Sequence, residues 1–346
     1  MTPARIAALT LFAGWRALLR VLLCLLAGTA SLGAQTVPNI EYANVGGQSL
    51  RLDLYLPAGA GPHPLVLWIH GGGWCAGGRA PLESYAGALP GEGVAVASVS
   101  YRLTSTTPNC ANNQGAIWPA AIHDIKGAVR FLRANAATWN LDPARFAVWG
   151  QSAGAHLALS LALSRNDSSL EGTVGGNAGQ SSAVSAVVAY YPPTDLLALG
   201  PDFALSPPNL PALVSVVDGP GQPHANLIGF GNAGEGMGLL RANAANPNPP
   251  WPGLLSRALS ASPLSWVDAS DPPVFLLHGS ADNVVPVHQS RRLRDALQSA
   301  TLPFLYREIS GLGHVPPDAA SSAEARAWVR ERLRPDALFA SGFEPN

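Results

Sequence analysis

The residue whose context points most clearly to a chemical role is Ser152, which stands in the run GQSAG at positions 150–154. An apolar stretch precedes the run and a helical pattern follows it, so a sharp turn from a strand into a helix is expected. Such a turn strains and crowds the serine, and glycines two residues before and two residues after it leave room. The N-terminus of the following helix favours developing negative charge. The pattern predicts that Ser152 is a nucleophile.

A serine hydroxyl is a weak nucleophile near neutral pH, so it needs a base, and the base needs an orienting group. His314 comes shortly after an apolar run at residues 304–309, and Asp282 comes shortly after another at residues 274–277. Open α/β sheets place their sites at the carboxyl ends of strands, so we predict His314 as the base and Asp282 as the acid. His288 is the alternative base, and Asp195, which follows an earlier strand, ranks second as the acid.

A glycine-rich loop, HGGGW at positions 70–74, follows the apolar run at residues 65–69. Acyl transfer passes through a tetrahedral oxyanion, which two or three fixed backbone N–H groups stabilise. We predict that Gly72 and Gly73 supply such groups from one side and Ala153 from the other. A phosphate-binding loop is the competing interpretation, but the loop has neither the G-x-G-x-x-G register nor a Walker lysine.

The elements that would carry these residues alternate along the chain. Strands are predicted at residues 50–56, 65–69, 94–99, 146–149, 184–191, 274–277 and 304–309, and helices at residues 118–135, 153–163, 289–299 and 323–333. The alternation predicts an α/β fold with a mostly parallel central sheet and helices on both faces. Residues 196–262 are rich in Pro, Gly and Asn, and we expect a partly helical, lid-like insertion over one end of the sheet. A disordered linker between two domains is the alternative.

The first 34 residues are organised like a secretory signal peptide. Arginines precede the apolar run at residues 21–27, and small residues follow it up to Ala34, so cleavage is expected after Ala34 or Ala30. The run is well short of the ~20 apolar residues that span a membrane, so no stable membrane anchor is expected. We therefore predict a secreted or periplasmic protein with a catalytic domain at residues 35–335 and a short tail at residues 336–346.

Export would leave two cysteines, Cys75 and Cys110, because Cys24 lies within the predicted signal peptide. An even number of cysteines in an oxidising compartment is typical of a disulfide. In the predicted fold the loops that hold these two cysteines rise from neighbouring strands, so a bridge between them would hold the glycine-rich loop in place. Two buried free thiols are the alternative.

The composition excludes several classes of partner. The chain is 47% hydrophobic and 12% charged, and its formal net charge is −1. A balance this close to neutral gives no sign of a nucleic-acid or polyanionic partner. No group of His, Cys and Asp residues has the spacing of metal ligands, and no organic cofactor is implied.

Five motifs occur in a fixed order: HGGGW, SYRL at positions 100–103, GQSAG, HGSAD at positions 278–282 and GLGH at positions 311–314. With them the chain, from about residue 40 to residue 333, resembles the α/β-hydrolase superfamily of serine esterases. Within it the chain is similar to the HGGGW carboxylesterases, which include acetyl and feruloyl esterase-type enzymes and are related to hormone-sensitive-lipase-like esterases. The resemblance implies cleavage of carboxylic esters through an acyl-enzyme, with a small-molecule ester or an ester-decorated carbohydrate as substrate.

Two other functions stay open at this stage. Related folds use a similar H-G-G-x-W loop on amides, so an arylformamidase or a peptidase is one alternative. A non-catalytic binding domain on the same fold is the other. The binding domain predicts a broken triad, whereas this sequence has an intact set of candidate residues.

Overall fold

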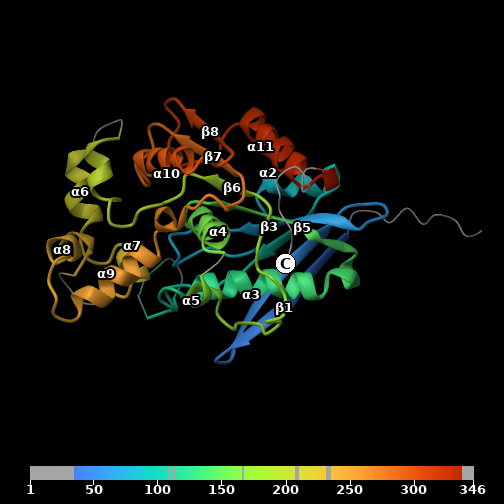
Figure 1. Cartoon of the computed structure of the whole chain (residues 1–346), viewed down its shortest axis with the longest axis horizontal. Coiled ribbons are helices and arrows are strands. Elements are labelled where there is room, and N and C mark those ends of the chain that lie inside the picture. Colours follow the sequence, from blue (N-terminus) through green and yellow to red (C-terminus); the bar gives the residue numbers. More distant parts are fainter. Residues whose placement is uncertain are drawn as a thin grey trace, which may run out of the picture. The chain divides into compact units, whose positions relative to one another are not determined.

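The computed structural model of the chain describes residues 35–107, 110, 112, 114–165, 167–206, 210–230 and 235–336. The predicted signal peptide and all of the predicted tail except Asp336 lie outside these residues. Figure 1 shows the arrangement of the described elements, with strands in the middle and helices on both sides.

One eight-stranded sheet forms the centre, in the order β1-β2-β4-β3-β5-β6-β7-β8. The strands are β1 (Gln35–Val45), β2 (Gln48–Leu56), β3 (His63–Ile69), β4 (Ala95–Val99), β5 (Leu141–Gln151), β6 (Val187–Tyr190), β7 (Val274–Gly279) and β8 (Phe304–Ile309). β2 pairs antiparallel with both β1 and β4, whereas the other neighbouring pairs are parallel. The parallel pairing brings the loops after β3, β5, β6, β7 and β8 to one edge of the sheet.

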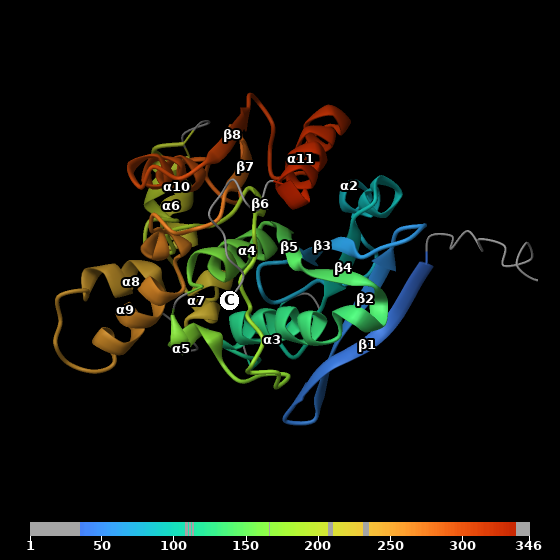
Figure 2. The same cartoon turned by 45° about the vertical axis from the view of Figure 1, so that its right-hand side comes forward.

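Helices cover both faces of this sheet (Figures 1 and 2). They are α2 (Ser84–Gly87), α3 (Ala120–Ala134), α4 (Ala153–Leu163), α5 (Ser168–Glu171), α6 (Pro211–Val217), α7 (Pro223–Leu227), α8 (Met237–Ala242), α9 (Trp251–Ser260), α10 (His288–Ser299) and α11 (Ala319–Arg332), with the short 3-10 helices η1 (Leu89–Glu92), η3 (Ala136–Trp139), η4 (Pro201–Ala204) and η5 (Pro263–Trp266). The buried side chains of α3, α4 and α10 pack on one face, and those of α2 and α11 pack on the other.

The side chains of β3 show how the sheet joins two apolar layers. Leu65, Leu67 and Ile69 belong to the cluster that includes α3 and α4, whereas Val66 and Trp68 belong to the cluster under α2 and α11. Successive side chains of a strand point to opposite faces, so a strand buried on both faces must be apolar throughout. The predicted α/β fold, with a mostly parallel sheet covered on both faces, is confirmed.

β1 lies outside the predicted strands. It is an edge strand, and most of its residues are exposed or half-buried. Its pairing with β2 shifts register between Val37 and Ile40, where Pro38 and the left-handed Asn39 (φ 61°) intervene. The alternation of apolar and polar residues that marks a strand is lost at such a shift, so the strand leaves a weak signal in the sequence.

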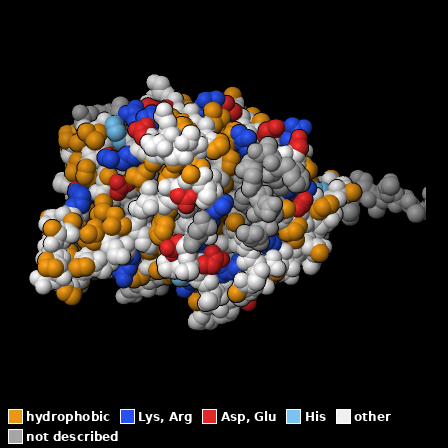
Figure 3. All heavy atoms as spheres, viewed as in Figure 1, with side chains coloured by type: hydrophobic (Ala, Val, Ile, Leu, Met, Phe, Trp, Pro, Cys, Tyr) orange, Lys and Arg blue, Asp and Glu red, His pale blue; other side chains and the backbone are white. Residues whose placement is uncertain are grey.

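The chain between β6 and β7 forms α6 to α9, which gather at the left of Figures 1 and 2. Side chains tie this segment to the rest of the fold: Trp118 Nε1 donates to Ser260 Oγ (2.9 Å), and His156 Nε2 donates to the Ala261 carbonyl (2.6 Å). Figure 3 shows apolar side chains on the surface in the region of α8 and α9. Leu239 of α8 and Leu259 of α9 are exposed. The segment is therefore partly helical and packed against the rest of the fold.

Candidate active site

Ser152 lies at the turn from β5 into α4, with φ 53° and ψ −124°. A residue other than glycine is strained in such a conformation, by about 1–3 kcal/mol. A Cβ atom on Gly150 would lie 2.2 Å from the Gly154 carbonyl oxygen, and one on Gly154 would lie 2.1 Å from the carbonyl oxygen of Ile69. The two glycines are thus required where β3, β5 and α4 approach most closely, and the strained turn holds the serine at the carboxyl edge of the sheet.

The side chains of Ser152, His314 and Asp282 form one hydrogen-bonded row. Ser152 Oγ lies 3.0 Å from His314 Nε2, and His314 Nδ1 lies 2.7 Å from Asp282 Oδ2. An ionised aspartate only accepts hydrogen bonds, so His314 donates from Nδ1 and keeps Nε2 free to accept the serine proton. The structure therefore brings together the three residues predicted as nucleophile, base and acid, from the ends of β5, β8 and β7.

Asp282 is buried and its carboxylate is well supplied with hydrogen-bond donors. Oδ1 accepts from the backbone N–H groups of Val284 (2.8 Å) and Val285 (2.9 Å), and Oδ2 also lies 3.2 Å from His278 Nε2. Burial raises the pKa of this carboxyl, but hydrogen bonds from His278 and His314 outweigh it and hold the pKa of Asp282 well below its usual range. The carboxylate is therefore charged at neutral pH, where it can stabilise a protonated His314.

The alternative base and acid lie elsewhere. His288 begins α10, and its Nδ1 lies 2.8 Å from Ser206 Oγ. Asp195 uses Oδ1 to accept from the backbone N–H groups of Leu197 (3.1 Å) and Ala198 (3.2 Å), as in an ordinary turn. The structure brings neither of them into the row with Ser152.

The glycine-rich loop lies beside Ser152 in the same cavity. Gly72 and Gly73 have φ angles of 111° and 58°, and a Cβ atom on Gly72 would lie 2.3 Å from the Ala76 carbonyl oxygen. Only glycine fits that backbone at Gly72. Ala153 opens α4, so its N–H has no partner within the helix. These are the three positions predicted as oxyanion donors.

His70 braces the start of this loop. Its Nδ1 donates to the Gly71 carbonyl (2.7 Å), and its ring stacks on Tyr101 at a centroid distance of 4.4 Å. Burial lowers the pKa of His70 to about 4, so the ring is neutral at neutral pH. Its role in this arrangement is to fix the loop and not to exchange protons.

Trp74 is the last residue of the glycine-rich loop, and its side chain is hydrogen-bonded to His156. The indole Nε1 donates to His156 Nδ1 (3.1 Å), and His156 Nε2 donates to the Ala261 carbonyl (2.6 Å). An indole N–H cannot accept, so this pair fixes the His156 tautomer with its proton on Nε2. Burial lowers the pKa of His156 to about 4. A neutral, buried histidine thus links the glycine-rich loop to the end of α9.

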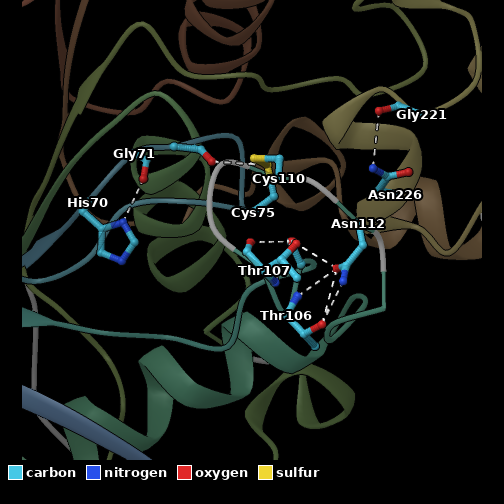
Figure 4. The surroundings of a disulfide bond; sticks show 11 residues. His70, Gly71, Cys75, Thr106, Thr107, Cys110, Asn112, Gly221 and Asn226 are labelled. Atoms are coloured by element: carbon cyan, nitrogen blue, oxygen red, sulfur yellow. Dashed lines mark hydrogen bonds between the residues drawn. A yellow bond between two sulfur atoms is a disulfide. The ribbon is translucent and has the colours of Figure 1, made fainter.

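A disulfide joins Cys75 to Cys110, with their Cα atoms 5.0 Å apart. Figure 4 shows the bond between the glycine-rich loop and the segment that carries Thr106, Thr107 and Asn112. Asn112 Oδ1 accepts from the Thr106 backbone N–H (3.0 Å). The bridge between the two predicted cysteines therefore ties Cys75, directly after the glycine-rich loop, to Cys110.

A cavity of about 720 Å³ opens above Ser152, a size that suits a small organic ligand. Part of its lining is apolar and comes from the segment between β6 and β7 and from the loop after β7: Leu199, Val217, Pro223, Val284 and Val285. Another part is polar and includes Glu83 and Gln151. Ser152 therefore faces both an apolar and a polar surface.

Tyr191, Glu83 and His224 also line this cavity and were not among the predicted site residues. Tyr191 directly follows β6, and its ring centroid lies 4.5 Å from that of His314. Its place at a strand end was a usable signal. Glu83 precedes the four-residue helix α2, and His224 is buried in α7, where burial lowers its pKa to about 4. Nothing in the local sequence pattern marks these last two residues.

Two further findings concern the described residues as a whole. No group of three or more His, Cys, Asp or Glu side chains among them is arranged to hold a metal ion. None of the helices in the described ranges has the length and apolar character needed to cross a membrane.

The match that decides the family covers more than half of the chain. The BD-FAE family model matches residues 52–216 and 253–297. This chain belongs to the BD-FAE family. The match includes the glycine-rich loop and Ser152, and it omits residues 217–252, which hold α7 and α8.

Two curated relatives of this BD-FAE protein are named as an esterase and a probable carboxylic ester hydrolase. Esterase LipQ of Mycobacterium tuberculosis is 30% identical over 302 residues, which are 85% of this chain and 59% of LipQ. The probable carboxylic ester hydrolase LipM of the same organism is 29% identical over 73% of this chain and 49% of its own length. The chain thus spans about half to three fifths of the length of these relatives.

Among solved structures, a truncated carbohydrate esterase from gut microbiota is 27% identical, with a TM-score of 0.68 over 88% of this chain and 98% of that one. Esterase 2 of Thermogutta terrifontis, at 21% identity, has a TM-score of 0.60 over 91% of this chain and 97% of its own. The second likeness concerns the fold alone. The resemblance to α/β-hydrolase esterases, inferred from the motifs, is confirmed.

Proposed function

We propose that this protein is a serine hydrolase that cleaves carboxylic esters through an acyl-enzyme intermediate. The observation that carries the proposal is the row in which Ser152 Oγ lies 3.0 Å from His314 Nε2 and His314 Nδ1 lies 2.7 Å from Asp282 Oδ2. That row faces a cavity that also contains the glycine-rich loop. A nucleophile, a base and an orienting acid in hydrogen-bond reach are the set that acyl transfer requires.

In the first half of the reaction Ser152 Oγ attacks the ester carbonyl carbon while His314 Nε2 takes the hydroxyl proton. The tetrahedral intermediate then collapses, the bond to the alcohol oxygen breaks, and His314 returns the proton to that alcohol. In the second half a water molecule attacks the acyl-serine, with His314 again taking and returning a proton. The charged Asp282 stabilises the imidazolium that forms in each half.

The oxyanion that forms in both halves needs donors that are already in place. We assign this role to the N–H groups of Gly72, Gly73 and Ala153, because they flank Ser152 from the loop and from the helix N-terminus. Donors of this kind are effective because they need no reorganisation when the charge appears, and removing one typically costs about 10²–10³ in rate.

The substrate class follows from the cavity and from the relatives. The apolar surface suits a short acyl chain or an aromatic acid, and the polar surface suits an alcohol that carries hydroxyl groups. The carbohydrate esterase similar to this chain supports the same class. We therefore propose an acetyl or feruloyl esterase-like activity on small esters or ester-decorated carbohydrates.

The test compares the native protein with Ser152→Ala on p-nitrophenyl acetate, p-nitrophenyl butyrate and methyl ferulate. We expect turnover by the native protein alone, and a fluorophosphonate probe should add its mass to the peptide that contains Ser152. A matched pair of p-nitrophenyl acetate and p-nitroacetanilide separates ester from amide hydrolysis. Faster cleavage of the anilide would make the protein an amidase, and equal activity of the Ser152→Ala variant would refute serine catalysis.

We also propose that the protein is exported and that residues 1–34 are removed. The disulfide between Cys75 and Cys110 supports export, because such bonds persist in oxidising compartments. Intact-mass analysis of protein secreted by a bacterial host should give a chain that begins at Gln35 or at Ser31. A chain that retains Met1 in the cytoplasmic fraction would contradict the proposal.

A further inference from the structure

The polar part of the cavity contains a carboxylate that the catalytic mechanism does not use. Glu83 is half-buried in this wall, and no arginine or lysine is among the described residues that line the cavity. The histidines His70 and His224 in the same lining are neutral at neutral pH, because burial lowers the pKa of each to about 4. Glu83 is therefore the one acidic side chain among the described lining residues, and no arginine or lysine of that lining pairs with it.

Gln151, the residue before the nucleophile, is held in one orientation beside this carboxylate. Its Oε1 accepts from Tyr85 Oη (2.6 Å) and from Tyr191 Oη (2.8 Å), so its amide nitrogen must point the other way. Gln151 Nε2 accordingly donates to Glu83 Oε1 (3.2 Å). The second carboxylate oxygen and the second amide proton remain as an acceptor and a donor in the cavity wall.

A second cavity adjoins the first at this wall. It has a volume of about 320 Å³, and it shares Glu83 and Pro316 with the cavity above Ser152. Its other lining residues are largely polar: Ser84, Tyr85, Pro317, Ala319, Ser322 and Arg326. These residues come from α2, from α11 and from the loop after His314, and α2 and α11 lie side by side in both views of the fold (Figures 1 and 2).

We propose that Glu83, Gln151 and this second cavity form a binding site for the alcohol part of the ester, and that this part is a neutral, polyhydroxylated group longer than one sugar ring. The inference rests on the proposed ester hydrolysis. His314 must reach the leaving oxygen, so the alcohol lies against the His314 side of the cavity. Tyr191 and Pro316, which flank His314, lead from there to Glu83.

The charges select a neutral group over a charged one. Glu83 repels an anionic alcohol at the entrance to the second cavity, whereas Arg326, although paired with Glu92 (2.7 Å), disfavours a cation further inside. Hydroxyl groups can instead donate to Glu83 and accept from Gln151 or Arg326. The two cavities have volumes of about 720 and 320 Å³, which together exceed what a simple alkyl alcohol would fill.

The test uses two substitutions in the full mature protein. Glu83→Gln keeps the size of the side chain and removes its charge, and it leaves the start of α2 intact because Glu83 makes no side-chain capping bond there. Ser84→Phe fills the second cavity and does not touch the lining of the first. Glu41→Gln, in β1, removes a carboxylate that lines neither cavity and serves as the matched control.

The measurement is kcat/KM for a mono-acetylated disaccharide, a mono-acetylated monosaccharide, an acetylated uronic acid and p-nitrophenyl acetate. We expect Glu83→Gln to lower the ratio for the disaccharide over p-nitrophenyl acetate about tenfold, as loss of a charge-assisted hydrogen bond does. The same substitution should raise the relative rate on the acetylated uronic acid. Ser84→Phe should lower the ratio of disaccharide to monosaccharide about tenfold. Glu41→Gln should leave every ratio unchanged.

The outcomes separate this inference from the proposed function. If Ser152-dependent hydrolysis of p-nitrophenyl acetate is seen but the sugar acetates are not cleaved, the inference is wrong while the esterase function stands. The inference is equally wrong if both substitutions change the ratios less than twofold. If p-nitrophenyl acetate is not hydrolysed through Ser152, both proposals fall together.

Discussion

The hydrogen bond from Trp74 to His156 offers the sharpest test of how this fold holds the glycine-rich loop in place. Trp74 directly follows Gly73 and has a left-handed backbone (φ 60°). This conformation is unfavourable for a bulky residue, so contacts of the side chain and the carbonyl must stabilise it. Its indole Nε1 donates to His156 Nδ1 (3.1 Å), and its carbonyl accepts from the Thr104 N–H (2.9 Å). Trp74→Phe removes the first bond and keeps an aromatic ring in place.

The magnitude follows from what is left behind. His156 Nδ1 is buried, so losing its donor costs about 1–3 kcal/mol of stability. In the reaction, the full loss of one oxyanion donor costs about 10²–10³ in rate. The disulfide at Cys75 and the Thr104 bond still hold the loop, so we expect part of that loss, roughly tenfold to a hundredfold in kcat. The KM should change much less, because the donors act mainly in the transition state.

A control removes an indole hydrogen bond outside the glycine-rich loop, and phenylalanine keeps an aromatic ring beside His156, whose ring centroid lies 5.7 Å from that of Trp118. Trp118 is also buried, and its Nε1 donates to Ser260 Oγ (2.9 Å) at the end of α9. Trp118→Phe should lower the free energy of unfolding by a similar amount and leave kcat close to native. Urea unfolding and p-nitrophenyl acetate kinetics on both variants decide the matter. If Trp74→Phe loses stability but keeps its kcat within twofold, the reasoning about the loop is refuted.

Three further perturbations follow from the structure. Ser152→Gly should abolish turnover and yet raise stability by on the order of 1 kcal/mol, because glycine relieves the strain at φ 53°; an unchanged unfolding midpoint would contradict this. Reducing the bond between Cys75 and Cys110 should lower the free energy of unfolding by about 3–4 kcal/mol, the chain-entropy value for a loop of 35 residues, as read from urea curves with and without dithiothreitol. Burial raises the pKa of Asp271 to about 7, against about 4 in an unfolded chain, so the stability that this group contributes at low pH is lost as the pH rises toward 7. Asp271→Asn should therefore be more stable relative to the native protein at pH 8 than at pH 4.

The catalytic row could be predicted because each of its members sits at a strand end that leaves a clear sequence signal. Ser152 is framed by two glycines that the backbone geometry requires, and Asp282 and His314 follow apolar runs that form β7 and β8. Parallel pairing then places those strand ends at one edge without any further information. The structure places Asp282, and not Asp195, in this row, because Asp282 Oδ2 lies 2.7 Å from His314 Nδ1.

The cavity wall could not be predicted, because its residues meet through contacts between segments that are distant in the sequence. Glu83 comes from the turn before α2, Gln151 from the end of β5 and Pro316 from the loop after β8. None of them stands in a periodic pattern that would mark it. β1 was not predicted for a local reason: Pro38 and Asn39 break the alternation of apolar and polar residues along this exposed edge strand.

The glycine-rich loop is where the proposed catalysis and the proposed substrate preference meet. The disulfide at Cys75 holds it from one side, and His156 links it through Trp74 to the end of α9. On a further side Pro223 packs so closely that a Cβ atom on Gly73 would lie 3.3 Å from its ring. Pro223 belongs to the residues that the BD-FAE match omits. A segment outside the family match therefore lies against the backbone predicted to bind the oxyanion, so we expect a change there to alter kcat together with acyl preference.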